Sequence, residues 1–85
     1  MSYLDTLSNL KVGDEGRIHN FTNDSIASKL LSMGVLPGKC VKLIRRAPFG
    51  GGLYIKVDDH SIAVRDEEAK SIVLECLDEL DLRKL

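Results

Sequence analysis

The chain has 85 residues, of which 12 are basic and 13 acidic, for a formal net charge of −1. Hydrophobic residues at 44% and charged residues at 29% are typical of one soluble globular domain. The near-zero charge gives no overall attraction to nucleic acid or anionic lipid, and no apolar run approaches the ~20 residues that span a bilayer. No basic stretch precedes an apolar one at the N-terminus, so we expect a cytoplasmic protein without a signal peptide.

The two cysteines, Cys40 and Cys76, stand far apart in the sequence. We expect two reduced, partly buried thiols, since cytoplasmic thiols stay reduced. A disulfide or a two-thiolate metal site is the alternative, although a zinc site usually shows more closely spaced ligand pairs.

The first half of the chain predicts a helical start, a strand and a helix. Tyr3, Leu4, Leu7 and Leu10 recur every three to four residues, which indicates a short amphipathic turn or helix. Residues 17–21 favour a first strand. Residues 26–33 place apolar side chains on one face of a two-turn helix, and residues 23–25 offer N-cap side chains.

The second half predicts four strands, at residues 40–46, 53–57, 61–65 and 71–74. Val41 and Leu43 share one face of the first, and the second alternates cleanly between inward and outward residues. Asp66 is predicted to cap a single helical turn through residue 70. Residues 75–85 favour an acidic, weakly amphipathic helix.

These elements predict a mostly β fold. It would be a small barrel of about five short strands, with one short helix between the first and second strands and helical termini. Closure into a barrel would remove exposed strand edges, which suits a short chain.

Two short sequence segments are more informative about the fold and family than the rest of the chain. Residues 30–38, LLSMGVLPG, are typical of a helix end that leads into a strand, since Gly34 can adopt the left-handed conformation that ends a helix. Residues 46–52, RAPFGGG, replace the strand pattern with a proline and three glycines, which predicts a wide hairpin tip. In this order and spacing they resemble the ferrous iron transport protein A family (FeoA-like domain). The match runs from Leu7 to Leu74, with further corresponding pieces at residues 13–18, 62–65, 68–69 and 72–74.

The resemblance implies an SH3-like barrel that forms a single domain over residues 1–85, with its core at 7–74 and a helical tail at 75–85. It also implies a non-enzymatic accessory of ferrous iron uptake. Such an accessory acts by contact with the membrane protein ferrous iron transport protein B and its cytoplasmic GTP-binding domain. No helix-turn-helix accompanies the barrel, so the role of related domains in iron-dependent repressors is not expected.

The residues themselves show no catalytic pattern. The glycines at 50–52 are not followed by Lys-Ser or Lys-Thr, so they do not form a phosphate loop. No Ser/His/Asp grouping or paired carboxylates appear in an acid–base context, and we expect no enzyme and no cofactor. Asp58, Asp59 and His60 supply ligand types that suit Fe(II), with His19 in another strand. The alternatives are solvated turn residues or a weak transition-metal site.

Charge is unevenly distributed along the sequence. Residues 39–57 contain no acid and five basic residues, whereas residues 66–81 are strongly acidic. Two interpretations are open, namely a basic hairpin that attracts an acidic partner and ordinary solvated faces. Phe49 at the predicted tip either anchors a partner or folds back over the barrel end, and Tyr54 between basic residues is a second candidate.

Leu31, Val35 and Leu36 surround the helix-to-strand turn and belong either to the core rim or to a groove beside the hairpin that receives a partner segment. The first hypothesis is therefore an adaptor whose partner-binding residues are Arg45, Arg46, Pro48, Phe49, Tyr54, Leu31 and Leu36. The second is an Fe(II)-responsive module. A nucleic-acid-binding barrel is disfavoured, because the chain has no Trp and only 5% aromatic residues.

Overall fold

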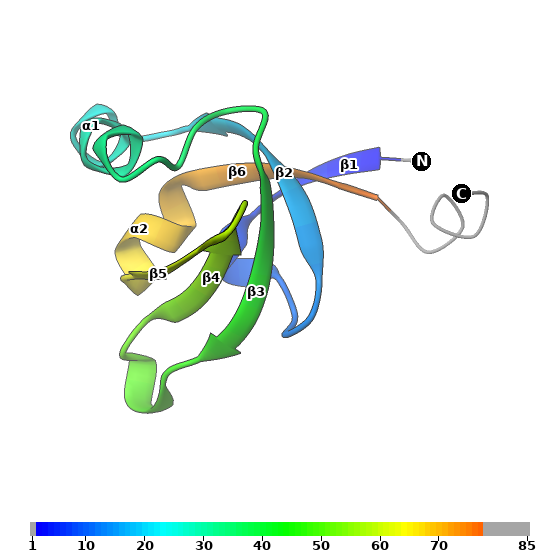
Figure 1. The fold of residues 1–85 in the computed structure, drawn as a ribbon, viewed down its shortest axis with the longest axis vertical. Coiled ribbons are helices and arrows are strands. Elements are labelled where there is room, and N and C mark those ends of the chain that lie inside the picture. The colour runs from blue at the N-terminus through cyan, green and yellow to red at the C-terminus, as the bar shows by residue number, and fades with distance from the viewer. Residues whose placement is uncertain (1, 78–85) are drawn as a thin grey trace.

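A computed structural model describes residues 2–77 as one antiparallel sheet of six strands with two short helices (Figure 1). The strands are β1 (Ser2–Thr6), β2 (Glu15–Phe21), β3 (Cys40–Arg46), β4 (Leu53–Val57), β5 (His60–Val64) and β6 (Ile72–Leu77). The helices are α1 (Asp24–Ser32) and α2 (Asp66–Ser71), and two 3-10 turns are η1 (Leu7–Asn9) and η2 (Pro48–Gly50). The order β1-β6-β2-β3-β4-β5 confirms the mostly β class.

The core fills the inner face of this sheet, and alternation of buried and exposed residues along the strands, interrupted by register shifts in β2 and β3, builds it. In β4 every second residue is buried, and in β3 the buried positions are Val41 and Leu43, as predicted. The largest fully buried side chains come from every part of the described chain, namely Leu7, Ile18, Leu30, Val35, Val41, Leu43, Leu53, Ile55, Val57, Ile72 and Leu74. One contiguous apolar cluster therefore joins both helices to the sheet.

Helix α1 has the N-cap segment and the terminating glycine that the sequence predicts, although it spans Asp24–Ser32 and not residues 26–33. The Asn23 side-chain oxygen accepts a hydrogen bond from the Ile26 N–H at 3.1 Å, which caps the helix. Gly34 has φ +87°, and the Val35 N–H then donates to the Leu30 carbonyl at 3.0 Å. This reversal places Val35 in the core. No helix within residues 2–77 has the length and apolar character needed to span a membrane.

The N-terminal prediction is wrong, because residues 2–6 form strand β1 instead of a helix. Tyr3 pairs with Cys76 and Leu4 with Glu75 across the β1–β6 ladder, and both Tyr3 and Leu4 are exposed. Leu7 and Leu10 are buried because η1 turns the chain inward after the strand. The helix-like spacing of apolar residues thus arises from a strand followed by a 3-10 turn.

Three further predictions need correction. The sheet has six strands, so α1 lies between the second and third. Strand β6 runs to Leu77, so the helix predicted from Glu75 is wrong for residues 75–77, while 78–85 lie outside the described residues. The N-cap of α2 is Arg65, and Asp66 is the first helical residue.

Full closure into a barrel was also expected, but the ladder pairing leaves two edges. Among residues 2–77, β1 pairs with β6 alone and β5 pairs with β4 alone, which places them at opposite ends of the strand order. The sheet is an open, curved arrangement, and its edge strands keep main-chain groups that no neighbouring strand uses.

Glu68 joins the two helices. Its Oε1 accepts the Arg65 N–H at 2.8 Å, and its Oε2 lies 2.6 Å from the Lys29 Nζ of α1, while its side chain is only 8% exposed. These contacts, first the hydrogen bond from the Arg65 backbone and then that from Lys29, hold the pKa of the Glu68 carboxyl below its usual value. The buried carboxylate thus has one partner on each oxygen.

Glu68→Gln should lower the free energy of unfolding at pH 7 by about 1–2 kcal/mol, because it removes a charge-assisted pair. The pKa of Glu68 is lowered by folding. The carboxylate therefore stabilises the fold above the unfolded pKa of about 4.3, and this contribution is lost as pH falls through the folded pKa. Urea unfolding at a series of pH values from 7 to 3 should show that the difference in free energy of unfolding between wild type and variant shrinks toward pH 3. The exposed neighbour Glu67→Gln is the matched control, and a gap independent of pH would contradict the assignment.

Candidate functional site

The outer face of hairpin β3–β4 carries the basic residues that the sequence singles out. Lys42, Tyr54 and Lys56 all occupy exposed positions of the alternating pattern. Arg45 pairs with Tyr54 in the ladder, and its guanidinium carbon lies 4.4 Å from the centre of the Tyr54 ring. This stacking orients the Arg45 charge over an aromatic surface. We call Lys42, Arg45, Tyr54 and Lys56 the basic face.

The basic face concentrates positive charge at a cost in stability. Lys42 and Lys56 are direct cross-strand partners, and like charges in that arrangement repel. Glu15 pairs with Lys42 on its other side. Within residues 2–77 the structure shows no ion pair on either lysine. A positive surface of this kind attracts an acidic partner more strongly than a mixed one.

Ile44 is an exposed residue that the sequence interpretation missed. The β3–β4 register shifts between Leu43 and Arg45, so Ile44 lies in a bulge and is 42% exposed. Bulges redirect side chains next to functional surfaces. The signal was available in the sequence, because the alternation of β3 stops after Leu43.

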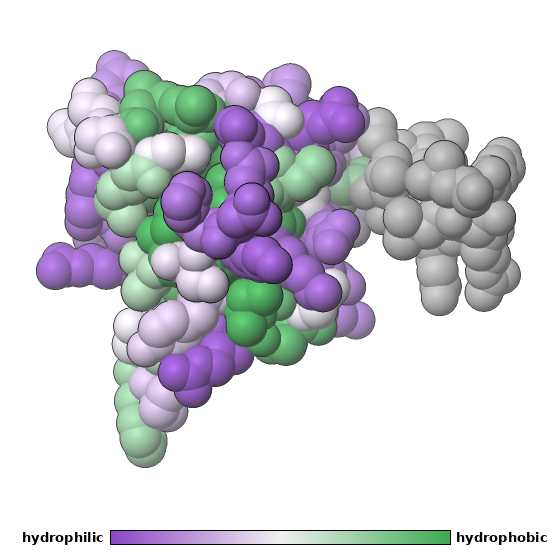
Figure 2. Space-filling model, viewed as in Figure 1, coloured by the Kyte–Doolittle hydropathy of each residue, from purple (hydrophilic) through white to green (hydrophobic). Residues whose placement is uncertain are grey.

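Phe49 at the hairpin tip is fully exposed, with a relative accessibility of 104%. Its φ of 59° and ψ of 34° lie in the left-handed region, which is rare for a bulky residue. Figure 2 shows this tip as a projection at the lower end of the molecule that ends in pale green, hydrophobic atoms. The alternative in which Phe49 folds back over the barrel is therefore wrong, and Pro48 beside it is exposed too.

The base of the tip is closed by the backbone. The Ala47 N–H donates to the Gly52 carbonyl at 2.9 Å, and the Gly51 N–H donates to the Pro48 carbonyl at 3.2 Å. Gly52 has φ +113°, and a Cβ there would collide with the Val64 carbonyl oxygen of β5. Only glycine allows β4 to start so close to β5. The apolar tip therefore projects from a tightly packed base.

Arg46 braces the same hairpin from the other side. Its Nη2 donates to the carbonyls of Ser8 at 2.7 Å and Leu10 at 2.6 Å. It thereby links the end of β3 to the turn after β1. Arg45 and Arg46, which were predicted together as partner-binding residues, thus have different surroundings, and Arg46 has a structural contact of its own.

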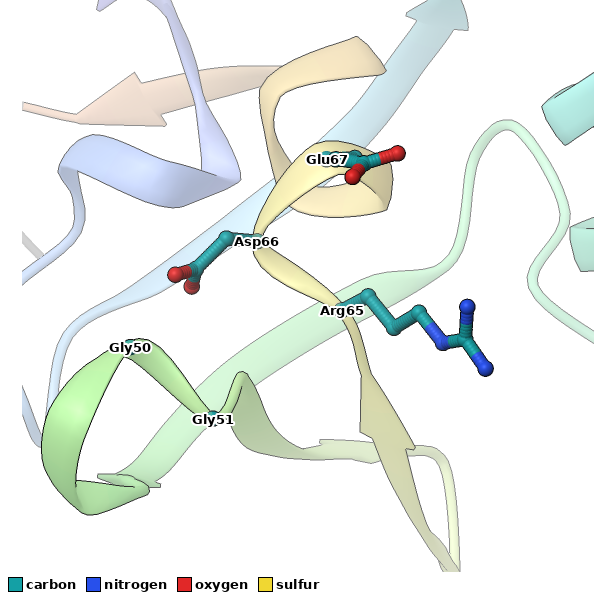
Figure 3. Close-up of a pocket in the computed structure, with 5 residues that line it drawn as sticks. All are labelled: Gly50, Gly51, Arg65, Asp66 and Glu67. Atoms are coloured by element: carbon teal, nitrogen blue, oxygen red, sulfur yellow. The ribbon is translucent and has the colours of Figure 1, made fainter.

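A shallow hollow of about 400 Å³ lies between the tip and α2, and Gly50, Gly51, Arg65, Asp66 and Glu67 line it. Figure 3 shows the Asp66 side chain directed toward Gly50, whereas the Arg65 side chain extends away. Asp66 Oδ2 would lie 3.4 Å from a Cβ on Gly50. A carboxylate in this position disfavours an anionic ligand such as a nucleotide phosphate.

The residues weighed as metal ligands do not converge. Asp58 and Asp59 form the β4–β5 turn, His60 opens β5, and the Asp58 carboxylate lies 2.7 Å from Lys39 Nζ. That pairing raises the pKa of Lys39. His19 lies on β2. Within the described chain, no group of three or more His, Cys, Asp or Glu side chains is arranged to hold a metal ion.

The two cysteines are free thiols, so the disulfide alternative is wrong. Cys40 is exposed on β3, where partial burial was expected, and Cys76 is buried in β6. Burial raises the pKa of the Cys76 thiol. A buried, protonated thiol is a weak nucleophile and packs as a small apolar residue.

The predicted helix-end residues lie apart from the hairpin tip. Leu31 and Leu36 are 43% and 39% exposed, whereas Val35 is fully buried. Met33, 37% exposed, extends this apolar patch. In Figure 1, α1 lies at the upper end of the long axis and the tip at the lower end. The structure therefore presents two separate surfaces.

Comparison with known proteins identifies the domain, because residues 6–76 match the model of the FeoA domain. The chain belongs to the FeoA family. It is 29% identical over 72 residues to an Fe(2+) transport protein A/Fe(2+) transporter FeoB fusion protein of Porphyromonas gingivalis. That alignment covers 84% of this chain but only 8% of the relative.

Solved structures support the same assignment. The FeoA of Stenotrophomonas maltophilia, an SH3 domain protein complexed with zinc, is 31% identical with a TM-score of 0.69. The alignment covers 82% of this chain and 88% of that one. An iron uptake regulatory protein FeoA is 25% identical with a TM-score of 0.77, covering 88% of this chain and 99% of that one. The expected SH3-like fold and the family link to ferrous iron transport are thereby confirmed.

Gly52→Ala should destabilise the protein by at least about 2 kcal/mol, because it adds a collision with the Val64 carbonyl to an unfavourable backbone conformation. Gly38→Ala is the control, since Gly38 has φ +91° but open space around its Cβ position. It should cost only the backbone strain, about 1 kcal/mol. If urea unfolding shows the same loss of free energy of unfolding in both variants, the close approach of β4 and β5 does not contribute to the effect at Gly52.

Arg46→Ala should lower the free energy of unfolding by about 1–3 kcal/mol, since two hydrogen bonds from a charged donor are lost. Arg45→Ala should cost less than about 1 kcal/mol, because it removes an exposed stacking contact. Thermal and urea unfolding of both variants would measure this difference. The reverse order of the two losses would contradict the bracing role of Arg46.

Proposed function

We propose that this chain is a non-enzymatic cytoplasmic accessory of ferrous iron uptake that binds the GTP-binding domain of an FeoB transporter. The observation that carries the proposal is the fully exposed Phe49, held in a left-handed conformation on a braced tip. A large apolar side chain in that position gains free energy only when a partner buries it. The fusion of an FeoA domain to an FeoB transporter in the Porphyromonas gingivalis relative supports the choice of partner.

The mechanism that we propose is steric and electrostatic. The basic face attracts an acidic surface of the partner, and the tip then inserts Pro48 and Phe49 into an apolar pocket. Because Arg46 and Gly52 fix the base of the hairpin, little conformational entropy is lost when the tip docks. The apolar patch of Leu31, Met33 and Leu36 offers a second, separate contact.

Binding to the purified cytoplasmic domain of the FeoB transporter from the same genome tests the proposal. Phe49→Ala and Arg45→Glu should each weaken the Kd at least about tenfold, as expected for an anchor and for a charge on the contacting face. Leu4→Ala is the matched control, because Leu4 is exposed on β1 at the other end of the strand order. Isothermal titration calorimetry measures all four proteins.

The outcome that contradicts the proposal is wild-type affinity in both Phe49→Ala and Arg45→Glu, or no binding by wild type. Repeating the titration with added Fe(II) and with a chelator tests the second hypothesis, an Fe(II)-responsive module. We expect the same Kd under both conditions, and a metal-dependent Kd would favour the second hypothesis.

A further inference from the structure

Strand β5 is an edge strand whose outward hydrogen-bonding groups are unused by the sheet. Of the described strands it pairs only with β4, and the two-residue turn makes Val57 and His60 its first hydrogen-bonded pair. Bonding then alternates, so that the main chains of Ser61 and Ala63 face away from β4. Within residues 2–77, neither residue takes part in another backbone hydrogen bond.

This edge lacks the usual protection against strand pairing. β5 contains no Lys, Arg, Asp, Glu or Pro, and Ser61 and Ala63 are small and exposed. The opposite edge, β1, differs because the Asp5 carboxylate accepts hydrogen bonds from the Thr6 N–H and the Asn9 side chain. Edge strands normally carry charges or prolines that prevent pairing with another chain. An unprotected edge is suited to accepting an added strand.

The surroundings of β5 indicate what kind of strand fits. On the outer face, Ser61 pairs with Lys56 and Ala63 pairs with Tyr54, so outward side chains of an added strand would reach the basic face across two small residues. On the inner face, Ile62 is half-buried beside the core. Alternating acidic and apolar residues match these two faces. Asp58 and Asp59 in the β4–β5 turn disfavour an acidic residue of the added strand beside that turn.

We infer that the free edge of β5 binds an extended partner segment of alternating acidic and apolar residues as an added strand. The inference rests on the proposed function, in which the chain docks onto a partner, and it adds the type of segment that is recognised. Main-chain hydrogen bonds to Ser61 and Ala63 supply the attachment, and Lys56 with the rest of the basic face supplies the preference for acid.

The test uses a synthetic capped peptide of sequence Val-Glu-Val-Glu-Val and NMR titration of the full chain. We expect saturable shifts at the Ser61 and Ala63 amides, and affinity that falls with added salt. A peptide with N-methyl groups at the central residues, or with Lys in place of Glu, should bind at least about tenfold more weakly. Equal binding of the N-methylated peptide overturns strand addition, and equal binding of the Lys peptide overturns the acidic preference.

Ala63→Pro removes one outward N–H while leaving the bonds to β4 in place, which an edge strand tolerates. It should abolish peptide binding, whereas Ala63→Thr should retain it. An unchanged affinity in a folded Ala63→Pro variant overturns the proposal. A second contrary outcome is that the wild type binds no peptide but dimerises with increasing concentration, and that Ala63→Pro abolishes this dimerisation. The edge of β5 would then bind a second copy of the chain, and the proposal would be overturned.

Titration of the FeoB domain with the same variants separates the two proposals. Loss of binding in the Phe49→Ala variant and in the Ala63→Pro variant supports the proposed function and strand addition alike. Loss in Phe49→Ala alone leaves the proposed function standing and overturns the role of β5. Peptide binding at the edge without any binding of the FeoB domain supports strand addition and overturns the choice of partner.

Discussion

Burial of one face of hairpin β3–β4 determines where the functional side chains of this domain point. Val41, Leu43 and Ile55 are almost completely enclosed, and side chains alternate along a strand. Lys42 and Lys56 must therefore emerge together on the opposite face, in spite of their mutual repulsion. The same apolar contacts that hold the sheet together thus produce a concentrated positive surface.

The tip of that hairpin combines exposure with restraint. Phe49 adopts a conformation that costs free energy, and the surrounding contacts must maintain it. The hydrogen bond from Ala47 to Gly52 closes the loop, and Arg46 holds the hairpin against the turn after β1. These contacts at the base of the hairpin hold the tip in place, so the tip needs no contact of its own with the core. Such division of roles is common in binding loops on rigid scaffolds.

Local chemistry made much of the fold predictable. The Asn23 cap, the reversal at Gly34 and the alternation of β4 each depend on residues that are close in sequence. The hairpin tip, with its proline and glycines, follows from the same kind of local pattern, whereas the sequence left two alternatives for Phe49 and the structure decided for exposure. Predictions of this type succeed because the deciding interaction lies within a few residues.

Long-range contacts account for what the sequence did not reveal. β1 is a strand because β6, some 70 residues later, pairs with it, and the local spacing of apolar residues alone favoured a helix. Arg46 binds carbonyls 36 and 38 residues away, and Glu68 meets Lys29 on another helix. Neither contact has a local signature. The exposed edge of β5 likewise becomes visible only once the strand order is known.

The position of β6 inside the sheet has a consequence for biosynthesis. Of the six strands it is the last to leave the ribosome, yet it lies between β1 and β2 and bonds to both. Until residues 72–77 have emerged, β1 has no neighbour and β2 has only one. The nascent domain can form its central hairpins early, but its sheet is assembled only when this final segment inserts between two strands made long before.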